Sequence, residues 1–277
     1  MFDLAELETA LAGTVFAGKL HFFPVTDSTN TDAVAAARGA APHGSVYFAD
    51  EQRAGRGRDD HAWHSAAGDG LYVSVILRPQ FPAARLPLLP LAVGLAAAEA
   101  IHDVAGVAID LRWPNDLLIG PRKAGGILVE AKNSGGLVDF AVVGIGINVH
   151  QSNFDSELDT LATSLDMEAG RRVSRQELLV SLLKSLEHEA LGMADAEAAA
   201  AIPARVEKAS TWICARRVEV HGPQACMGVT AGLDEHGFLL VVTERGLVSV
   251  QTGGIRAATC DWAEAIGTER RDDAVSD

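Results

Sequence analysis

The chain has 277 residues, 48% of them hydrophobic, and it carries 37 acidic against 23 basic residues, for a formal charge of −14. A chain of this length can bury one large core and a small second domain. The negative charge opposes a general attraction to nucleic acid, which depends on basic surface, so DNA is not expected as a partner.

Cysteine usage and hydropathy indicate a cytoplasmic protein. Cys214, Cys226 and Cys260 are odd in number and lack Cys-x-x-Cys spacing, which predicts neither a disulfide framework nor a zinc site. The N-terminus lacks a basic, apolar and cleavable pattern, and no apolar run of about 18 residues is free of charge. We therefore expect a cytoplasmic protein with no membrane partner.

The first half of the chain alternates short helices with apolar, β-like runs. Asp27–Asn30 supply N-cap residues, and Pro90 suits the first turn of a helix whose apolar residues recur at helical spacing. In chain order, the pattern predicts a helix at Asp3–Gly13, a strand at Leu20–Phe23, a helix at Thr31–Ala37, strands at Ser45–Ala49 and Leu71–Leu77, a helix at Pro90–His102, and strands at Ile109–Trp113, Leu117–Ile119, Gly126–Ala131 and Phe140–Val149.

The second half begins helical and ends in short strands. Ser174–Leu191 is predicted to be a helix opened by a capping box from Ser174 to Glu177, and Ala194–Lys208 a second helix, broken at Pro203. Strands are then expected at Arg217–His221, Met227–Leu233, Phe238–Thr243 and Leu247–Gln251. Such closely spaced strands indicate a small β-barrel or sandwich.

A glycine-rich loop with two arginines lies between the predicted strands Ser45–Ala49 and Leu71–Leu77. In Gly55-Arg56-Gly57-Arg58, each guanidinium offers a planar charged fork for phosphate or carboxylate, and the glycines let the backbone approach a ligand. A surface Arg-Gly-Arg turn has the same sequence. The loop alone therefore leaves both a phosphate-binding site and a plain turn open.

The segment Arg112-Trp113-Pro114-Asn115-Asp116 follows an apolar run. Trp113 and Pro114 fit a core residue and a strand end, whereas Asn115 and Asp116 can present an amide and a carboxylate to a nucleotide or its metal ion. Magnesium commonly takes one or two carboxylates together with substrate phosphates. Asp116 is therefore the candidate magnesium ligand.

Lys123 precedes two glycines and an apolar run. Such a lysine is often only solvated, but the glycines let a ligand approach, and a compact ammonium suits a reacting phosphate or carboxylate. The run Gly144–Val149 fails as a dinucleotide fingerprint, because Val149 stands at the third glycine position. The sequence has no Gly-x-x-x-x-Gly-Lys-Ser/Thr loop either, and Asn148 is either a pocket residue or a turn former.

Taken in order, these segments resemble those of the biotin protein ligases. The resemblance spans nearly the whole chain and rests on Asp27–Asn30, Glu51–Arg58, Trp63, Trp113–Asp116, Lys123 with Gly125–Glu130, and Gly144–Val149. It implies an α+β fold, with a central mixed β-sheet flanked by helices and a C-terminal SH3-like β-barrel domain. The expected domains are a catalytic ligase domain at 1–210 and an SH3-like domain at 211–264, followed by a charged, disordered tail at 265–277.

The resemblance also implies two successive reactions. The biotin carboxylate attacks the α-phosphate of ATP to form biotinyl-5'-AMP and pyrophosphate, and a lysine amine of a biotin carboxyl carrier protein then attacks that anhydride. Biotin and ATP are substrates in this scheme, Mg²⁺ is an activator, and no tightly bound prosthetic group is expected. The family is compatible with a homodimer.

Site residues follow from the same resemblance, position by position. The implied catalytic residues are Lys123, Arg56 and Arg58. The implied biotin-binding residues are Ser28, Thr29, Asn30, Gln52, Arg56, Gly57, Arg58, Lys123 and Gly126. The implied nucleotide-binding residues are Arg56, Arg58, Trp63, Asn115, Lys123 and Asn148, with Asp116 on the metal side.

Two segments depart from the family pattern. Where the family loop commonly continues with a further Gly-Arg, this chain has Asp59-Asp60-His61, and the acids are expected to offset part of the attraction of Arg58 for phosphate. Thr252-Gly253-Gly254-Ile255 lacks the acidic residue often found in the family's final strand motif. That difference weakens any inference about carrier contacts there.

Two other functions stay open. A lipoate or octanoyl transferase of the same superfamily would be expected to show a different arginine-glycine-glycine signature and a histidine-aspartate partner. A non-catalytic biotin-responsive binding protein is the second, although Lys123 argues against it. Only about 25 residues precede Thr26, too few for a three-helix DNA-binding module, so a monofunctional ligase is expected.

Overall fold

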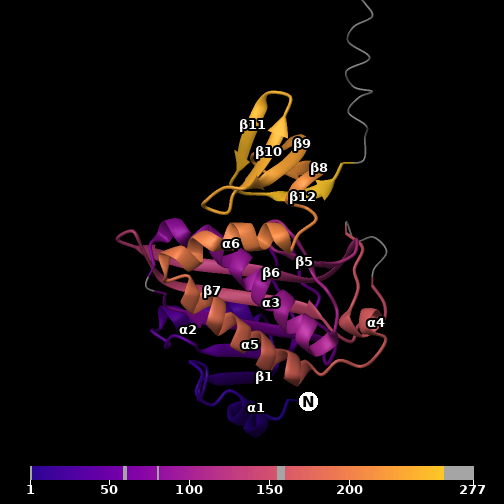
Figure 1. Ribbon diagram of the computed structural model, residues 1–277. Helices are drawn as coiled ribbons and strands as arrows, with labels where there is room; N and C mark the ends of the chain where they lie inside the picture. The colour runs from indigo at the N-terminus through magenta and orange to yellow at the C-terminus, as the bar shows by residue number, and fades with distance from the viewer. Residues whose placement is uncertain (1, 59–60, 80, 155–159, 259–277) are drawn as a thin grey trace, which may run out of the picture.

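The computed structural model describes residues 2–58, 61–79, 81–154 and 160–258, which form two sheets. Figure 1 shows the larger sheet in the body of the molecule and the smaller one at one end, beyond α6 (Ala196–Lys208). The expectations for Asp59, Asp60, Cys260 and the tail at 265–277 concern residues outside the described part of the chain.

The larger sheet is mixed and has seven strands in the order β1-β2-β3-β7-β6-β5-β4. The edge strand β1 runs parallel to β2, and the other neighbours are antiparallel. The strands are β1 (Leu20–Thr26), β2 (Val46–Gln52), β3 (Gly70–Leu77), β4 (Asp110–Arg112), β5 (Asp116–Ile119), β6 (Arg122–Ser134) and β7 (Leu137–Asn148). The expected α+β fold with a central mixed sheet is confirmed.

Helices pack on both faces of this sheet. On one face α3 (Leu89–Ala105) packs against α5 (Arg175–Gly192), and on the other α2 (Thr29–Arg38) contacts β2, β3 and β7. Successive strand residues serve the two faces, as the two-residue period of a strand requires. Val75 and Leu77 accordingly join the main core, whereas Ile76 joins the cluster under α2. The remaining helices are α1 (Leu4–Ala10), the 3-10 helix η1 (Ala83–Leu88) and α4 (Leu165–Ala169).

The C-terminal sheet is antiparallel, with five strands in the order β11-β10-β9-β8-β12, as expected for an SH3-like domain. Its strands are β8 (Cys214–His221), β9 (Cys226–Leu233), β10 (Leu239–Thr243), β11 (Gly246–Val250) and β12 (Gly254–Ala257). Hydrogen bonds tie this sheet to the body of the molecule. Trp113 Nε1 donates to the Gly237 carbonyl (3.1 Å), and the Leu233 amide donates to Glu207 of α6 (2.8 Å).

Several boundaries differ from the sequence-based ones. Strand β6 begins at Arg122, so Lys123 lies within a strand, and Gly126 pairs with Gly146 of β7 instead of following a turn. Pro203 does not break α6, although proline removes one helical hydrogen bond. Ile202 and Val206 are buried on either side of it, and this packing holds the helix together. The sequence did not predict η1 or α4.

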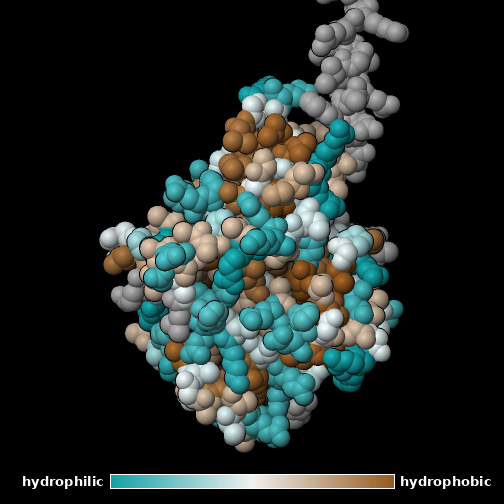
Figure 2. Space-filling model, viewed as in Figure 1, coloured by the Kyte–Doolittle hydropathy of each residue, from teal (hydrophilic) through white to brown (hydrophobic). Residues whose placement is uncertain are grey.

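The segment Ala83–Ala105, covering η1 and α3, is long and apolar enough to cross a membrane by length and composition. In this fold 56% of its apolar window is buried, and Val93, Ala97 and Ile101 have no exposed surface. It therefore serves as a core helix here. Figure 2 shows apolar residues gathered instead on the C-terminal sheet, where the exposed large apolar side chains are Met227, Val229, Val242 and Leu247.

Candidate active site

One large cavity, of about 1430 Å³, is lined by residues of both sheets. Its walls include the start of α2 and the loop between β2 and β3 that carries Arg56 and Arg58, which we call the arginine loop. Strands β3, β6 and β7, the turn between β4 and β5, and two loops of the C-terminal sheet complete them. Every residue that the sequence singled out for the site lines it: Ser28, Thr29, Asn30, Gln52, Arg56, Gly57, Arg58, Trp63, Asn115, Asp116, Lys123, Gly126 and Asn148.

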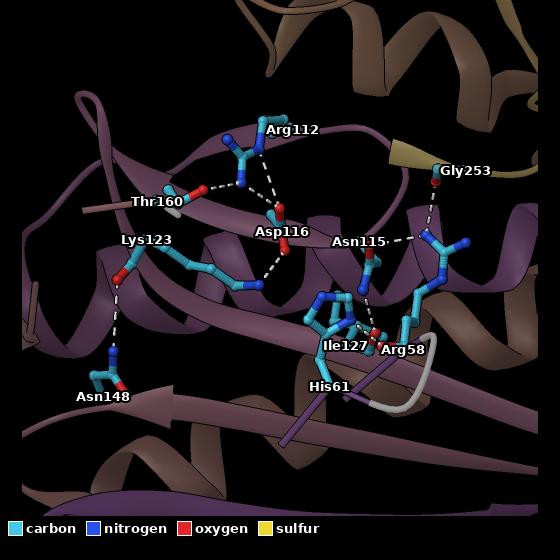
Figure 3. A network of polar contacts seen from close by, with 10 residues as sticks. All are labelled: Arg58, His61, Arg112, Asn115, Asp116, Lys123, Ile127, Asn148, Thr160 and Gly253. Atoms are coloured by element: carbon cyan, nitrogen blue, oxygen red, sulfur yellow. Dashed lines mark hydrogen bonds and ion pairs between the residues drawn. The ribbon is translucent and has the colours of Figure 1, made fainter. Parts of the chain in front are cut away.

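A carboxylate held between two cations lies in the wall of this cavity (Figure 3). Lys123 Nζ is 2.6 Å from Asp116 Oδ1, and Arg112 donates to Asp116 Oδ2 through Nη2 (2.7 Å) and Nε (3.0 Å). Burial alone would raise the pKa of Asp116. The charges of Lys123 and Arg112, together with their hydrogen bonds, outweigh that effect and lower the pKa below its ordinary value.

This arrangement does not fit a protein-held magnesium site. Both carboxylate oxygens of Asp116 are already bound by cations. Among the described residues, no group of three or more His, Cys, Asp or Glu side chains could hold a metal ion. The chemistry of the donor set therefore favours holding Lys123 in place over binding a cation.

Lys123 is fixed by its backbone as well as its side chain. Its amide donates to the Leu161 carbonyl (2.7 Å), and its carbonyl accepts from the Thr163 amide (3.0 Å). Asn148, at the end of β7, donates through Nδ2 to the Thr163 carbonyl at 3.1 Å. Asn148 therefore braces the segment beside Lys123 while lining the cavity.

The arginine loop narrows to a small hairpin at its base, which we call the loop neck and define as residues 55–57 and 61–63. The Gly57 amide donates to the His61 carbonyl (2.7 Å), and the Trp63 amide donates to the Gly55 carbonyl (2.8 Å). A methyl group on Gly55 would lie 2.3 Å from the Trp63 carbonyl oxygen, so only glycine fits there. His61 Nδ1 also lies 2.8 Å from the Arg58 carbonyl oxygen.

Arg58 reaches from this loop to both sheets (Figure 3). Its Nη1 donates to Asn115 Oδ1 (3.2 Å) and to the carbonyl of Gly253, which directly precedes β12 of the C-terminal sheet (3.0 Å). Gly253 has φ 120°, and a methyl group there would lie 2.0 Å from the His221 carbonyl oxygen. A glycine is therefore required where the Thr252–Ile255 segment meets Arg58. Both hydrogen-bond acceptors that Arg58 has among the described residues are neutral, so neither of them offsets its charge.

Trp63 lies across two glycines of neighbouring strands. A methyl group on Gly146 would approach Cε2 and Nε1 of Trp63 to 2.6 Å, and one on Gly126 would lie 3.4 Å from its ring. Lys123 Nζ is 5.6 Å from the ring centroid on the same surface. The buried Trp63 Nε1 has no hydrogen-bond partner among the described residues. Because neither glycine has a side chain, the Trp63 ring can pack directly against the backbone of the two strands.

A chain of hydroxyl and amide groups lines the end of the cavity near α2. Gln52 Oε1 accepts from the Thr29 amide (2.9 Å) and hydroxyl (3.1 Å), and the Thr29 hydroxyl lies 2.9 Å from Ser74 Oγ. Gln52 Nε2 donates to Ser65 Oγ at 2.8 Å. Ser28 Oγ is buried without a partner among the described residues. This end can therefore offer both donors and acceptors to a small polar ligand group.

Asn30, Glu130 and Arg56 form a second polar cluster at the rim. Arg56 binds Glu130 with both ends of its guanidinium, Nη1 to Oε2 at 3.0 Å and Nη2 to Oε1 at 3.1 Å. Asn30 Nδ2 donates to the same Oε2. A methyl group on Gly144 would lie 2.6 Å from Asn30 Oδ1, so that glycine makes room for the asparagine.

The sequence assigned no role to several residues that shape this cavity. They are the lining residues Ser65, Ser74, Arg112, Gly144, Gly146, His221 and Gly253, and Glu130, which pairs with the lining residue Arg56. Ser74 could have been found as a hydroxyl inside an otherwise apolar buried strand, and Gly146 as a glycine in a run that fails the dinucleotide pattern. Nothing in the local sequence indicates a role for Arg112 or Glu130, because their roles depend on the residues that the fold places beside them.

The chain matches known proteins along most of its length. The model of the biotin/lipoate A/B protein ligase family matches residues 22–148. The bifunctional ligase/repressor BirA of Bacillus subtilis is 38% identical over 185 residues, 66% of this chain, which spans only 57% of that relative's length. The biotin–[acetyl-CoA-carboxylase] ligase of Mycobacterium tuberculosis is 34% identical over 236 residues, 83% of this chain and 85% of that one.

A solved structure supports the same relationship. The biotin protein ligase of Aquifex aeolicus, in complex with biotin and ATP, superposes with a TM-score of 0.76 at 30% sequence identity. The match covers 87% of this chain and 100% of that one. The structural likeness therefore extends well beyond the 22–148 segment that the family model matches.

Proposed function

Because the chain belongs to the biotin/lipoate A/B protein ligase family, we propose that it is an ATP-dependent biotin ligase that modifies a lysine of a carboxylase carrier protein. One observation carries the proposal. A single cavity joins a polar, hydroxyl-lined end with a cationic end, and Trp63 packs on Gly126 of β6 and Gly146 of β7. That combination suits a small polar ring, a carboxylate and a nucleotide bound side by side.

The biotin end is proposed to lie at the start of α2. The hydroxyls of Ser28 and Thr29 and the amide of Gln52 supply donors and acceptors for a ureido ring, and Ser74 continues this chain. Asn30 and Gly57 also line the cavity. The glycine at 126 leaves space beside Lys123 for the ligand's carboxylate.

Lys123 is proposed to act on the first reaction. A biotin carboxylate oxygen attacks the α-phosphorus of ATP, and pyrophosphate leaves with the electrons of the broken P–O bond. Charge collects on the non-bridging oxygens as this happens, and a fixed ammonium lowers the barrier by stabilising it. Asp116 and Arg112 hold the Lys123 ammonium in position.

Arg58, Asn115, Asn148 and Trp63 are proposed to serve the nucleotide. Arg58 supplies a cation whose hydrogen-bond acceptors are neutral, and Trp63 offers an aromatic surface. Asn115 orients Arg58, and Asn148 braces the strand segment at Lys123. With the loop over the adenylate, water is kept from the mixed anhydride until a carrier lysine attacks its carbonyl carbon and releases AMP.

Magnesium is proposed to enter as the counter-ion of the ATP phosphates, as part of that substrate. The ion pairs of Asp116 leave its carboxylate committed to Lys123 and Arg112. A carrier domain as protein substrate, a homodimer and a cytoplasmic location remain parts of the proposal. Sedimentation of the purified protein tests the dimer, and cell fractionation tests the location.

Mass spectrometry of a carrier domain tests the function directly. After incubation with ATP, magnesium and biotin, we expect a mass gain of one biotinyl group on a single lysine. Lipoate in place of biotin separates this ligase from a lipoate or octanoyl transferase of the same family. Binding of biotin without carrier modification or pyrophosphate release would instead point to a non-catalytic binding protein.

A further inference from the structure

The two arginines of the loop have different electrostatic surroundings. Arg56 forms a bidentate pair with the Glu130 carboxylate, whereas the Arg58 side chain bonds to an amide oxygen and a backbone carbonyl. A carboxylate at 3.0 Å largely neutralises a guanidinium, and neutral acceptors do not. Arg58 is therefore the better arginine for a phosphate, and Arg56 is already occupied.

Glu130 is itself held in place from beneath. Asn30 is 4% exposed, lies in the first turn of α2, and donates to Glu130 Oε2. The close fit of Asn30 over Gly144 leaves the amide little room to move. Glu130 therefore presents its carboxylate at a position set by the sheet and by α2.

Arg56 belongs to the loop neck, so holding Arg56 holds the neck. The backbones of Arg56 and Ala62 pair as an isolated antiparallel β-bridge, and the Gly55 carbonyl accepts a hydrogen bond from the Trp63 amide across the neck. Trp63 in turn lies on Gly126 and Gly146 beside Lys123. A tether at Arg56 therefore also positions the indole over the cavity floor.

We propose that Glu130 is the positioning residue that anchors the arginine loop to the sheet, with Asn30 as its support and Arg56 as the tethered group. The anchor fixes the neck, while Arg58 stays available for the anionic ligand. This inference rests on the proposed function for its effect on adenylate, but its effect on the unliganded loop is independent of that function.

The first experiment is amide hydrogen exchange on the unliganded chain. Glu130→Gln removes the carboxylate charge at nearly constant size, and we expect exchange of the Gly57 and Trp63 amides to accelerate about three- to fivefold, the scale of a partly exposed ion pair. The matched control is Asp139→Asn. Asp139 lies on β7 and pairs with Arg78 (3.7 Å) and Lys132 (3.5 Å), away from the loop. Unchanged exchange in Glu130→Gln, or equal changes in both variants, would refute the anchor.

A charge swap tests the pairing itself. In Glu130→Arg with Arg56→Glu the two charges trade places, and the Asn30 amide can turn its oxygen toward the new guanidinium. We expect the double variant to recover part of the slow exchange that each single variant loses. If the double variant exchanges faster by the product of the two single-variant accelerations, the two residues act independently.

Adenylate release then connects the anchor to the proposed reaction. With biotin and ATP, we expect Glu130→Gln to release adenylate about three- to fivefold faster, with retention falling more than pyrophosphate formation. If the parent chain makes no adenylate, the proposed function fails while the exchange result still decides the anchor. If the parent makes adenylate and Glu130→Gln holds it as tightly, the anchor has no role in retention. Tighter retention would mean that Glu130 is a latch that competes with the ligand.

Discussion

Lys123 Nζ lies 2.6 Å from Asp116 Oδ1, and Arg112 binds the other oxygen of the same carboxylate. One anion thus orders two cations at the wall of the cavity, and an excess of positive charge remains. The Asp116 side chain is 15% exposed, which limits how far water screens the cluster. The cluster can therefore hold the Lys123 ammonium ready for an anionic ligand.

We expect Lys123→Met to slow biotin-dependent pyrophosphate release about a hundredfold or more, the scale of losing one preorganised charge contact. The matched control is Lys132→Met, on the same strand, where the lysine pairs with Asp139 at 3.5 Å outside the cavity. Pyrophosphate release at saturating biotin and ATP is the measurement. Near-normal release from Lys123→Met would remove it from the catalytic residues.

We expect Gly146→Ala to weaken ligand binding more than Gly126→Ala. The new methyl group would lie 2.6 Å from Trp63 Nε1 in the first case and 3.4 Å from the ring in the second, so only the first must displace the indole. Titration of biotin and of ATP by calorimetry measures the difference, with thermal unfolding as a check on the fold. Equal losses in the two variants would argue against Trp63 as part of the binding surface.

Arg58→Met is expected to release adenylate about tenfold faster, because one charge-assisted contact contributes roughly 1.5 kcal/mol. The free anhydride should then label bystander lysines. Arg171→Met is the control, because that arginine donates to the Val104 carbonyl and does not line the cavity. The effect should shrink at high salt, since Arg58 acts through charge. A salt-independent loss would indicate that its bonds to Asn115 and Gly253 matter more.

The loop arginine Arg56 has a separate expectation. Arg56→Gly should also loosen adenylate retention, but through the neck, because Arg56 is tethered to Glu130. Combining Arg56→Gly with Glu130→Gln should then speed adenylate release little more than either change alone. Release rates for the two single variants and the double variant decide this.

Acid should weaken the fold partly through Asp116. Its pKa in the folded chain is lowered, so the stability it contributes is fully present above the unfolded-state pKa of about 4 and is lost as the pH falls through the lower folded value. Asp116→Asn should therefore cost about 3 kcal/mol at pH 6, because it leaves two cations without their anion. Urea unfolding at several pH values should show this difference shrinking toward pH 3. A gap that widens in acid would contradict the assignment.

The sequence determined the local elements and marked many of the residues that line the cavity. A nearly continuous run of apolar, β-favouring residues identified strands such as Leu71–Leu77, and the glycine-rich loop and the Asn115-Asp116 pair marked cavity residues before any fold was known. These features are local, because backbone geometry and side-chain chemistry set them within a few residues. The first residues of β6, which include Lys123, were not predicted as strand, because Gly125 and Gly126 resemble a turn in the sequence. Only the structure shows Gly126 paired with Gly146 of β7.

Only the tertiary structure decided which charges meet. The sequence assigns the same roles to Arg56 and Arg58, but the fold brings the Glu130 carboxylate to Arg56 and the Gly253 carbonyl to Arg58. Likewise, Asp116 resembles a metal ligand until Lys123 and Arg112 are found on its two oxygens. The interaction energy of two charges depends on the distance between them. That distance is fixed only when the sheets and domains have packed, so no local sequence pattern encodes it.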